Sequence, residues 1–208
     1  MKQPLTAEAF AAMTGLAPGT VQRLANYLEI LRSWQPRINL VGSGTLDDPW
    51  RRHCLDSIQL LSLLPPGRPV VADLGSGAGF PGMVLAIASD AAVTLVDSDT
   101  RKCAFLREAA RATATSITIE NRRIETLPRG FADVVTARAL APLPRLLALA
   151  APLLRPGGTA LFLKGSGVEG ELTAAAETWT MGVERMQSIS HADGIVIKLT
   201  DIRRRDDG

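Results

Sequence analysis

The sequence predicts an α/β fold: a mostly parallel sheet covered by helices on both faces, with an antiparallel hairpin at one edge and a helical extension before the sheet. Three observations predict it. From residue 70 onward, short apolar runs alternate with helical stretches, which is typical of a parallel sheet buried on both sides. A Gly-rich loop follows the first apolar run. Before residue 65, apolar residues recur at the spacing that indicates helices.

The composition is that of one globular domain with an extension, because 208 residues of which 46% are hydrophobic can bury a core without cross-links. A net charge of +2 excludes a strongly basic nucleic-acid coat. The sequence has neither a signal-peptide core nor an apolar run of the ~18 residues that span a membrane. With Cys54 and Cys103 as the only cysteines, we expect a cytoplasmic monomer with no metal site and no membrane partner.

Two helices are expected in the extension. Thr20 is predicted to cap the first, and Pro36 to end it. Asp48 and Pro49 are predicted to begin the second, which runs to Leu64. A Pro-rich break at residues 65–69 follows. It divides the chain into a helical extension packed on the core, residues 1–69, and a Rossmann-like core, residues 70–208.

Five strands are then expected in order, at residues 70–74, 92–96, 117–119, 133–136 and 159–163. A helix capped by Asp99 follows the second strand, and another spans residues 143–154. Residues 183–189 and 195–199 predict an antiparallel hairpin through the Asp-Gly turn at residues 191–194. We expect the tail from Arg203 onward to be solvated and frayed.

The loop from Asp73 to Phe80 has the pattern Asp-x-Gly-x-Gly-x-Gly at the end of the first strand. It differs from the dinucleotide fingerprint, which has glycine where this chain has Phe80. The pattern resembles motif I of class I S-adenosylmethionine methyltransferases. Gly75 and Gly77 would then let the backbone approach the cofactor closely. The alternative is a purely structural turn.

Acidic residues at the ends of the next strands support a cofactor site. Asp97 ends the second strand, where a carboxylate can accept hydrogen bonds from both ribose hydroxyls. The alternative, that Asp97 caps the next helix, is weakened because Asp99 is placed to do so. Glu125 follows the third strand, where this fold often touches the adenine, although it can equally be an ordinary loop residue.

The sequence supports neither of two common acceptor chemistries. Residues 136–142 stand where exocyclic-amine methyltransferases carry Asn/Asp-Pro-Pro-aromatic, and they lack that motif. Pyrimidine C5 methylation needs a cysteine nucleophile, but Cys54 and Cys103 lie in predicted helices and fit a core better. An acceptor with its own lone pair, such as guanine N7, remains. It needs alignment and exclusion of water rather than a general base.

Basic residues are the candidates for holding the acceptor. Arg138 and Lys164 end the fourth and fifth strands, at the sheet edge where ligands bind, and can position guanine or bond the cofactor carboxylate. The alternative is solvent-exposed strand ends. Further candidates for RNA contact are Arg51, Arg52, His53, Arg101, Lys102, Arg122 and Arg123. Each can instead belong to a solvated helix face, with Asp56 pairing with His53.

These residues resemble the bacterial small-subunit ribosomal RNA guanine-N7 methyltransferase G family (RsmG, also called glucose-inhibited division protein B). The matching motifs are Asn39-Leu40, Arg52-His53-x-x-Asp56-Ser57, Asp73 to Gly82, Arg101-Lys102 before Phe105-Leu106, Thr136 to Ala139 and Lys164-Gly165. They extend over nearly the whole chain. Two departures, Val41-Gly42 after Asn39-Leu40 and Arg101 in place of a second Lys, lie outside the cofactor loop.

The resemblance implies that the cofactor is S-adenosylmethionine and that the acceptor is N7 of guanine 527, in the 530 loop of 16S rRNA. The partner would be 16S rRNA or the small ribosomal subunit. It also implies cofactor contacts at Gly75, Phe80, Ile124, Glu125 and Arg138.

Three other functions stay open. A class I methyltransferase acting on another RNA, a small molecule or a protein would share the cofactor residues. A nicotinamide-dependent dehydrogenase would share the sheet, but Phe80 counts against its glycine loop. A non-catalytic RNA-binding module would keep the arginines without needing the loop.

Overall fold

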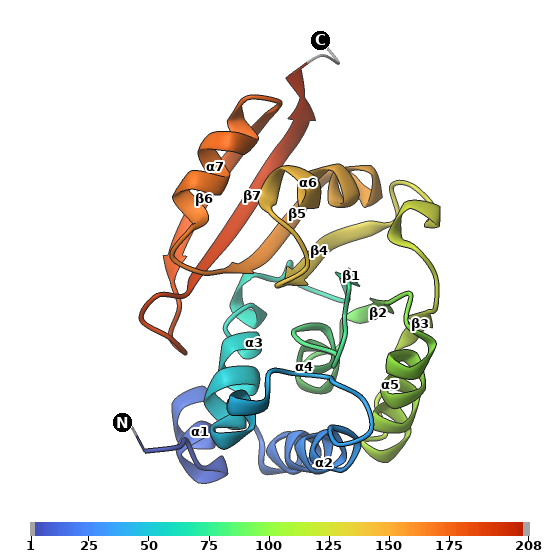
Figure 1. Cartoon of the computed structure of the whole chain (residues 1–208), viewed down its shortest axis with the longest axis vertical. Helices are drawn as coiled ribbons and strands as arrows, with labels where there is room; N and C mark the ends of the chain where they lie inside the picture. Colours follow the sequence, from blue (N-terminus) through green and yellow to red (C-terminus); the bar gives the residue numbers. More distant parts are fainter. Residues whose placement is uncertain (1–2, 206–208) are drawn as a thin grey trace.

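The computed structural model describes residues 3–205, which form a seven-stranded sheet with helices on both faces (Figure 1). The strands are β1 (Val70–Leu74), β2 (Ala92–Val96), β3 (Thr118–Glu120), β4 (Ala132–Arg138), β5 (Leu154–Lys164), β6 (Trp179–Gln187) and β7 (Ile195–Arg204). Their spatial order is β3-β2-β1-β4-β5-β7-β6. The first five strands pair in parallel, and β7 is antiparallel to β5 and β6. The order reverses between β1 and β4, so a ligand crevice is expected at their carboxyl ends.

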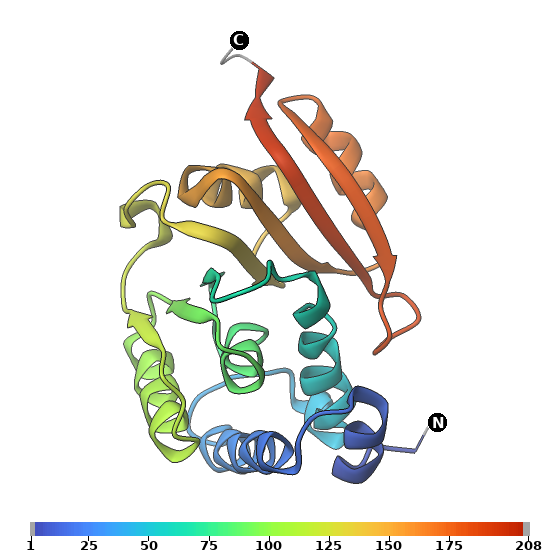
Figure 2. The ribbon, with the colours of Figure 1, turned by 180° about the vertical axis from the view of Figure 1, so that it is seen from behind.

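The helices are α1 (Ala7–Thr14), α2 (Pro18–Trp34), α3 (Asp56–Ile58), α4 (Gly82–Ala88), α5 (Thr100–Ala112), α6 (Leu143–Ala150) and α7 (Val168–Ala176). The carboxylate of Asp99 caps α5 by accepting the backbone N–H groups of Arg101 and Lys102, as predicted. No sequence signal predicted α7. The views from the front and from behind agree that α1 and α2 lie beneath the sheet (Figures 1 and 2).

Two apolar clusters hold the layers together, one on each face of the sheet. On β5, Leu161 and Leu163 belong to the cluster that contains residues of α2, α4 and α5, whereas Ala160 and Phe162 belong to the cluster that contains residues of α6 and α7. This alternation follows from the two-residue period of strand side chains. The first cluster also takes in Tyr27 of α2, so the N-terminal helices share a core with the sheet. The domain boundary at residue 69 stays a prediction.

The N-terminal helices differ from their predicted limits. Helix α2 begins at Pro18 rather than at Thr20, and its first residue explains this, because proline is favoured at the first helical position. The expected second helix is instead a π-helical segment, Trp50–Leu55, followed by α3 and a 3₁₀ turn, Leu61–Leu63. Asp48 does not cap it. Its carboxylate accepts the backbone N–H of Leu5 and pairs with Arg51.

The C-terminal hairpin is present, but its strands are longer than predicted. Strand β6 begins at Trp179 and β7 continues to Arg204, so part of the expected tail is strand. Residues 206–208 of that tail lie outside the described part of the chain. Seen from behind, the hairpin extends well beyond the other strands (Figure 2). Because β7 inserts between β5 and β6, β6 is the edge strand on this side of the sheet, and β3 is the edge strand on the other.

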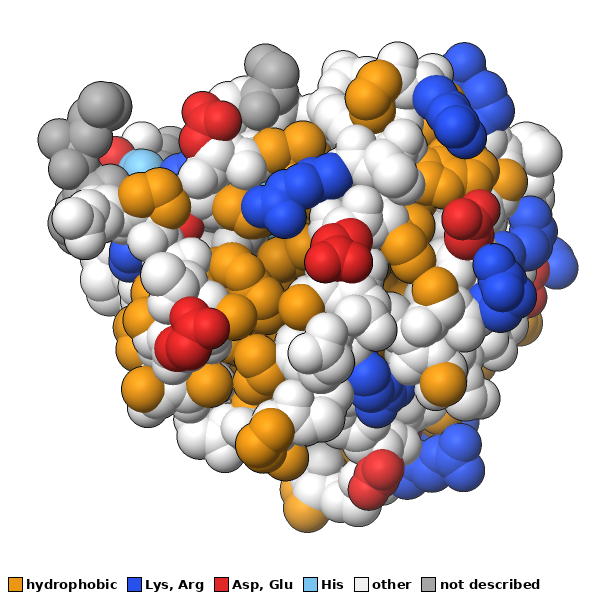
Figure 3. Space-filling model, turned by 90° about the horizontal axis from the view of Figure 1, so that it is seen from below, with side chains coloured by type: hydrophobic (Ala, Val, Ile, Leu, Met, Phe, Trp, Pro, Cys, Tyr) orange, Lys and Arg blue, Asp and Glu red, His pale blue; other side chains and the backbone are white. Residues whose placement is uncertain are grey.

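The underside of the molecule carries apolar side chains with acidic and basic ones interspersed among them (Figure 3). Basic side chains are more frequent toward the side where α5 lies. This face is therefore not a uniformly basic surface. Within residues 3–205, no helix is long and apolar enough to cross a membrane.

Candidate functional site

Two cavities meet at the carboxyl ends of the central strands. The larger, of about 560 Å³, has walls that include Thr45, His53, Gly75, Phe80, Arg138 and Ser190. The smaller, of about 360 Å³, is lined by residues that include Asp97, Lys102, Ile124, Glu125 and Arg145. Gly75 and Ala139 line both. An elongated ligand can therefore lie across Gly75 with one end in each cavity.

The glycine loop turns between β1 and α4 with left-handed backbone at Gly75, Gly77 and Gly79. At Gly79 a side chain is excluded, because an added Cβ would lie 2.9 Å from Met83 and from the Tyr27 hydroxyl. At Gly77 the nearest atom to an added Cβ is a backbone oxygen 3.8 Å away, so the backbone itself faces open space. The loop thus offers bare backbone to a ligand.

Asp73, the first residue of the loop pattern, is fully buried beneath it. Thr136 Oγ1 donates a hydrogen bond to its Oδ1 at 2.9 Å, while Oδ2 has no hydrogen-bond partner within residues 3–205. Burial raises the pKa of Asp73 to about 6. Gly82 makes room for this carboxyl group, since an added Cβ there would lie 2.7 Å from the Asp73 side chain.

Asp97 fastens the glycine loop to the end of β2. Its Oδ2 accepts the backbone N–H of Gly77 at 2.8 Å, and its Oδ1 accepts that of Asp99 at 2.8 Å. Each carboxylate oxygen has a further lone pair, and the side chain lines the smaller cavity. Ile124 and Glu125 lie on the same cavity, with Glu125 about half exposed beside Arg123. These three predicted cofactor residues are therefore brought together.

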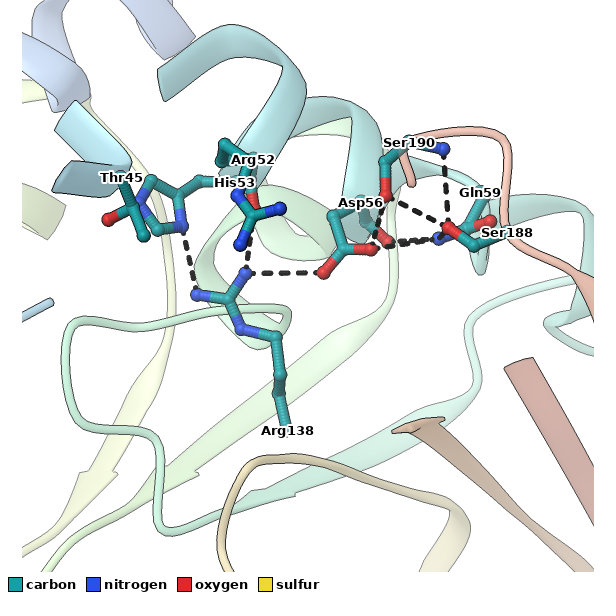
Figure 4. Close-up of polar contacts among 8 residues, drawn as sticks. All are labelled: Thr45, Arg52, His53, Asp56, Gln59, Arg138, Ser188 and Ser190. Carbon is teal, nitrogen blue, oxygen red and sulfur yellow. Dashed lines mark hydrogen bonds and ion pairs between the residues drawn. The ribbon is translucent and has the colours of Figure 1, made fainter. Parts of the chain in front are cut away.

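The Arg138 guanidinium is the centre of a hydrogen-bond network between the sheet and the N-terminal helices (Figure 4). Its Nη1 donates to the carbonyl of Arg52 at 3.0 Å and to Asp56 Oδ2 at 3.3 Å. Its Nη2 donates to His53 Nδ1 at 3.0 Å. Three of the five guanidinium hydrogens are thus used, and Nε–H and one Nη2–H have no partner within residues 3–205. Two donors are left for a ligand in the larger cavity.

His53 was predicted as an RNA contact, but the structure encloses it. Only 2% of the residue is exposed, and its ring stacks on Phe80 with centroids 4.6 Å apart. Burial, then Arg138 and Arg52, lower the pKa of His53 to about 3, so the ring is neutral. Because Arg138 can only donate, Nε2 carries the proton and donates to Thr45 Oγ1 at 2.9 Å.

Phe80 stands at the position where a dinucleotide-binding loop has glycine, and three side chains pack against its ring. The His53 ring covers one part of it, and the Arg138 guanidinium carbon lies 4.9 Å from its centroid. Tyr27 packs against it at 5.1 Å and donates its hydroxyl hydrogen to the Ala78 carbonyl. Phe80 is therefore a packing residue that sets the positions of His53 and Arg138 as well as a cavity wall.

Asp56 pairs with Arg138 and not with His53, the partner that the alternative interpretation of the sequence gave it. The His53 nitrogens are used by Arg138 and Thr45, which leaves the carboxylate to the arginine. On its other side, Asp56 Oδ1 accepts the Ser190 hydroxyl at 2.6 Å and the Gln59 amide at 3.2 Å (Figure 4). One carboxylate thus joins β4, the N-terminal helices and the turn between β6 and β7.

Lys164 lines the larger cavity, yet its ammonium is already engaged. It donates to Glu171 at 2.6 Å and to the Ala141 carbonyl at 2.9 Å, and its side chain is 10% exposed. The same Glu171 oxygen accepts the backbone N–H of Leu143. Lys164 therefore holds the loop after β4 in place in this structure.

The remaining predicted basic residues divide between the cavities and the surface. Arg52 lines the larger cavity, and Lys102, Arg122 and Arg123 line the smaller. Arg51 and Arg101 line neither. Arg51 pairs with Asp48 and donates to the Gln3 carbonyl, and Arg101 pairs with Asp99 and is 74% exposed. In both pairs the acidic partner is a near neighbour in the sequence. The sequence alone did not show whether these arginines pair locally or face RNA.

Sequence reasoning missed several site residues. They are Thr45, Gln59, Arg145, Glu171, Ser188 and Ser190. Single Ser, Thr and Gln residues far apart in sequence carry no spacing signal that would have found them. Both cysteines are buried, as predicted, and within residues 3–205 no cluster of His, Cys, Asp or Glu can hold a metal ion.

The strand order, the loop at the switch point and the strand-end acid define a class I S-adenosylmethionine-dependent methyltransferase fold. Solved structures agree with this class. An S-adenosylmethionine-dependent methyltransferase from Aquifex aeolicus has a TM-score of 0.59 and 15% identity, covering 76% of this chain and 95% of that one. M. jannaschii TYW2 in complex with AdoMet has a TM-score of 0.58 and 14% identity, covering 81% and 80%.

Sequence comparisons identify the family. A family model described as rRNA small subunit methyltransferase G matches residues 20–197. Ribosomal RNA small subunit methyltransferase G of Rhodospirillum rubrum is 56% identical over 200 residues, which cover 96% of this chain and all of that protein. The protein of the same name from Parvibaculum lavamentivorans is 46% identical, covering 98% and 93%. The chain belongs to the rRNA small subunit methyltransferase G family.

Proposed function

We propose that the chain transfers the methyl group of S-adenosylmethionine to N7 of guanine 527 in the 530 loop of 16S rRNA. Membership of the family supports methylation of small-subunit rRNA. The observation that carries the atom assignment is the chemistry of the larger cavity. Two histidines line it: His53 is neutral and committed to Arg138 and Thr45, and Nδ1 of His191 accepts the backbone N–H of Asp193, so neither presents a free basic nitrogen to the cavity. Guanine N7 needs no general base, because its lone pair is free at neutral pH.

The residues at the two cavities fit the proposed cofactor. Its ribose would lie at Asp97, and its adenine would lie between Ile124 and Glu125 in the smaller cavity. Its methionine part would cross Gly75 into the larger cavity, where the two remaining Arg138 donors suit a carboxylate. S-adenosylmethionine supplies an electrophilic methyl group on a positively charged sulfur.

The chain's own residues have three tasks in this reaction. The bare backbone at Gly77 admits the cofactor closely, and the packed Phe80 and His53 rings exclude water from one wall. Arg138, held from behind by Asp56, orients the groups that enter the larger cavity. Alignment of the acceptor nitrogen, the methyl carbon and the sulfur is then the main contribution to rate.

Mass mapping of 16S rRNA from cells with and without the gene tests the proposal. We expect one methyl group at guanine 527 to disappear with the gene and to return with the wild-type copy. Methylation at another rRNA position, or on a small molecule with the rRNA unchanged, would replace the guanine 527 assignment by the alternative that is observed.

A further inference from the structure

The turn between β6 and β7, residues 188–194, is a wall of the larger cavity. Ser190, His191, Asp193 and Gly194 line that cavity. The smaller cavity is lined entirely by residues between Gly75 and Leu149. The turn therefore lies at the end of the cleft away from the proposed adenosine site, on the side from which an acceptor has to enter.

The turn is anchored to the N-terminal helices by hydrogen bonds from successive residues. Gln59 donates to Ser188 Oγ at 3.1 Å and accepts the backbone N–H of Ile189 at 3.2 Å. Ser190 donates to Asp56 at 2.6 Å, and its own N–H is bonded to Ser188 Oγ (Figure 4). Because Asp56 also holds Arg138, the position of the turn is tied to that of the guanidinium.

This anchoring leaves the side chain of Ile189 exposed to solvent. Ser188 and Ser190 are both buried, with their hydroxyls directed to Asp56 and Gln59. Ile189, the residue between them, is 58% exposed. Within residues 3–205, Met13 at 56% is the one other large hydrophobic residue exposed to this degree. On this anchored turn beside the cavity, the apolar side chain of Ile189 is available to a base that approaches the cavity.

We propose that residues 188–194 contact the RNA on the acceptor side and that Ile189 packs against the base next to the acceptor guanine. This inference rests on the proposed function. A guanine that enters the larger cavity must leave its stack, and enzymes that act on a base extrude it in this way. Apolar side chains, isoleucine among them, stabilise an opened base step by inserting into it. Ile189 fills the space that the departing guanine leaves.

The test compares Ile189→Ser with Met13→Ser, a matched change at the other exposed apolar side chain. On folded 16S rRNA or the small subunit, we expect kcat/KM of Ile189→Ser to fall about tenfold, with Ile189→Leu near wild type. Met13→Ser should stay within twofold. Because Ile189 lines neither cavity, the calorimetric Kd for S-adenosylmethionine should be unchanged in all three.

A second substrate separates base opening from general RNA affinity. On an unstructured oligonucleotide carrying the same guanine, Ile189→Ser should approach wild-type efficiency, because little unstacking is needed. Equal losses on both substrates, or a change within twofold on folded rRNA, would overturn the role of Ile189 while leaving the proposed function intact. A wild-type protein that binds S-adenosylmethionine but methylates no rRNA would overturn both.

Discussion

Asp56 Oδ2 lies 3.3 Å from Nη1 of Arg138, so a carboxylate of the N-terminal helices holds the guanidinium that ends the central strand β4. The two side chains are 18% and 20% exposed. Shielding of this degree makes the pair stronger than an exposed one, because less water screens it. The pair also orients the guanidinium. Asp56 bonds Nη1, so the Nε–H and one Nη2–H stay available to a ligand.

Arg138→Ala should weaken S-adenosylmethionine binding if Arg138 holds the cofactor carboxylate. Loss of a charge-assisted bond costs about 1.5–3 kcal/mol, or roughly 10–150-fold in Kd. Arg138→Lys should recover little, because a point charge cannot replace the planar fork. If Arg138 instead positions guanine, Kd should hold while turnover at saturating cofactor falls.

Calorimetry and single-turnover methylation distinguish these outcomes. Arg155→Ala is the control, because Arg155 forms a similar ion pair with Asp133 and lines neither cavity. If Arg138→Ala keeps both its Kd for S-adenosylmethionine and its turnover within twofold of wild type, Arg138 binds neither the cofactor nor the guanine.

Asp97→Ala should weaken cofactor binding at least tenfold if Asp97 holds the ribose as proposed, since it would remove two charge-assisted bonds of about 1.5–3 kcal/mol each, less what water recovers. It also frees the Gly77 N–H that now fixes the loop. Asp99→Ala is the matched control: it removes the α5 cap and should lower Tm while leaving Kd unchanged. Unchanged affinity in Asp97→Ala, or tighter binding of NAD than of S-adenosylmethionine, would contradict the assignment.

His53 should make the folded chain sensitive to acid. Its pKa is about 3 in the folded state, against 6.5 for an unperturbed histidine, so the unfolded chain binds more protons between these pH values. Stability is therefore lost as pH falls below about 6.5, by about 2 kcal/mol at pH 5. His53→Gln, which retains a donor and an acceptor, should show a flatter curve of Tm against pH.

Asp73 contributes with the opposite sign. Its pKa is raised to about 6 from 3.8, so the folded state binds more protons in that interval and gains stability as pH falls. Comparing wild type with His53→Gln cancels this contribution, because both chains keep Asp73. Parallel Tm curves from pH 7 to pH 5 would show that His53 is not held neutral.

Folded substrate should be preferred over an isolated loop. The net charge of +2 provides modest attraction for phosphate, and the underside mixes charges of both signs. A short hairpin should bind weakly and with strong salt dependence, whereas shape adds to charge on folded 16S rRNA and on 30S particles. Methyl incorporation into the three substrates checks this, and equal efficiency on all of them would be the contrary result.

The sheet could be predicted because its signals are local. Strands β1, β2 and β4 are short apolar runs, and the glycine loop indicates the turn at the switch point. The network around Arg138 could not be predicted, since its partners are separated from it by 82 to 86 residues. The burial of His53 could not be predicted for the same reason: three consecutive basic residues in a sequence do not show which of them turns inward.

The π-helical segment is a second feature that the sequence did not predict. Apolar spacing predicted one continuous helix to Leu64, but the wider turn at residues 50–55 is followed by only three α-helical residues. Hydrophobic periodicity does not detect a change of winding that keeps the same residues buried. That change places His53 and Asp56 beside Arg138.

Tyr27 of α2 donates its hydroxyl hydrogen to the Ala78 carbonyl, so the glycine loop is supported by a distant part of the chain. Phe10, Leu24 and Leu31 belong to the same buried cluster as Phe105 of α5 and Val93 of β2. A shortened chain that begins at residue 65 would expose this apolar face to water and leave Ala78 without its donor. We expect such a fragment to aggregate rather than to serve as a minimal enzyme, because the helices before residue 65 supply part of the core that supports the glycine loop.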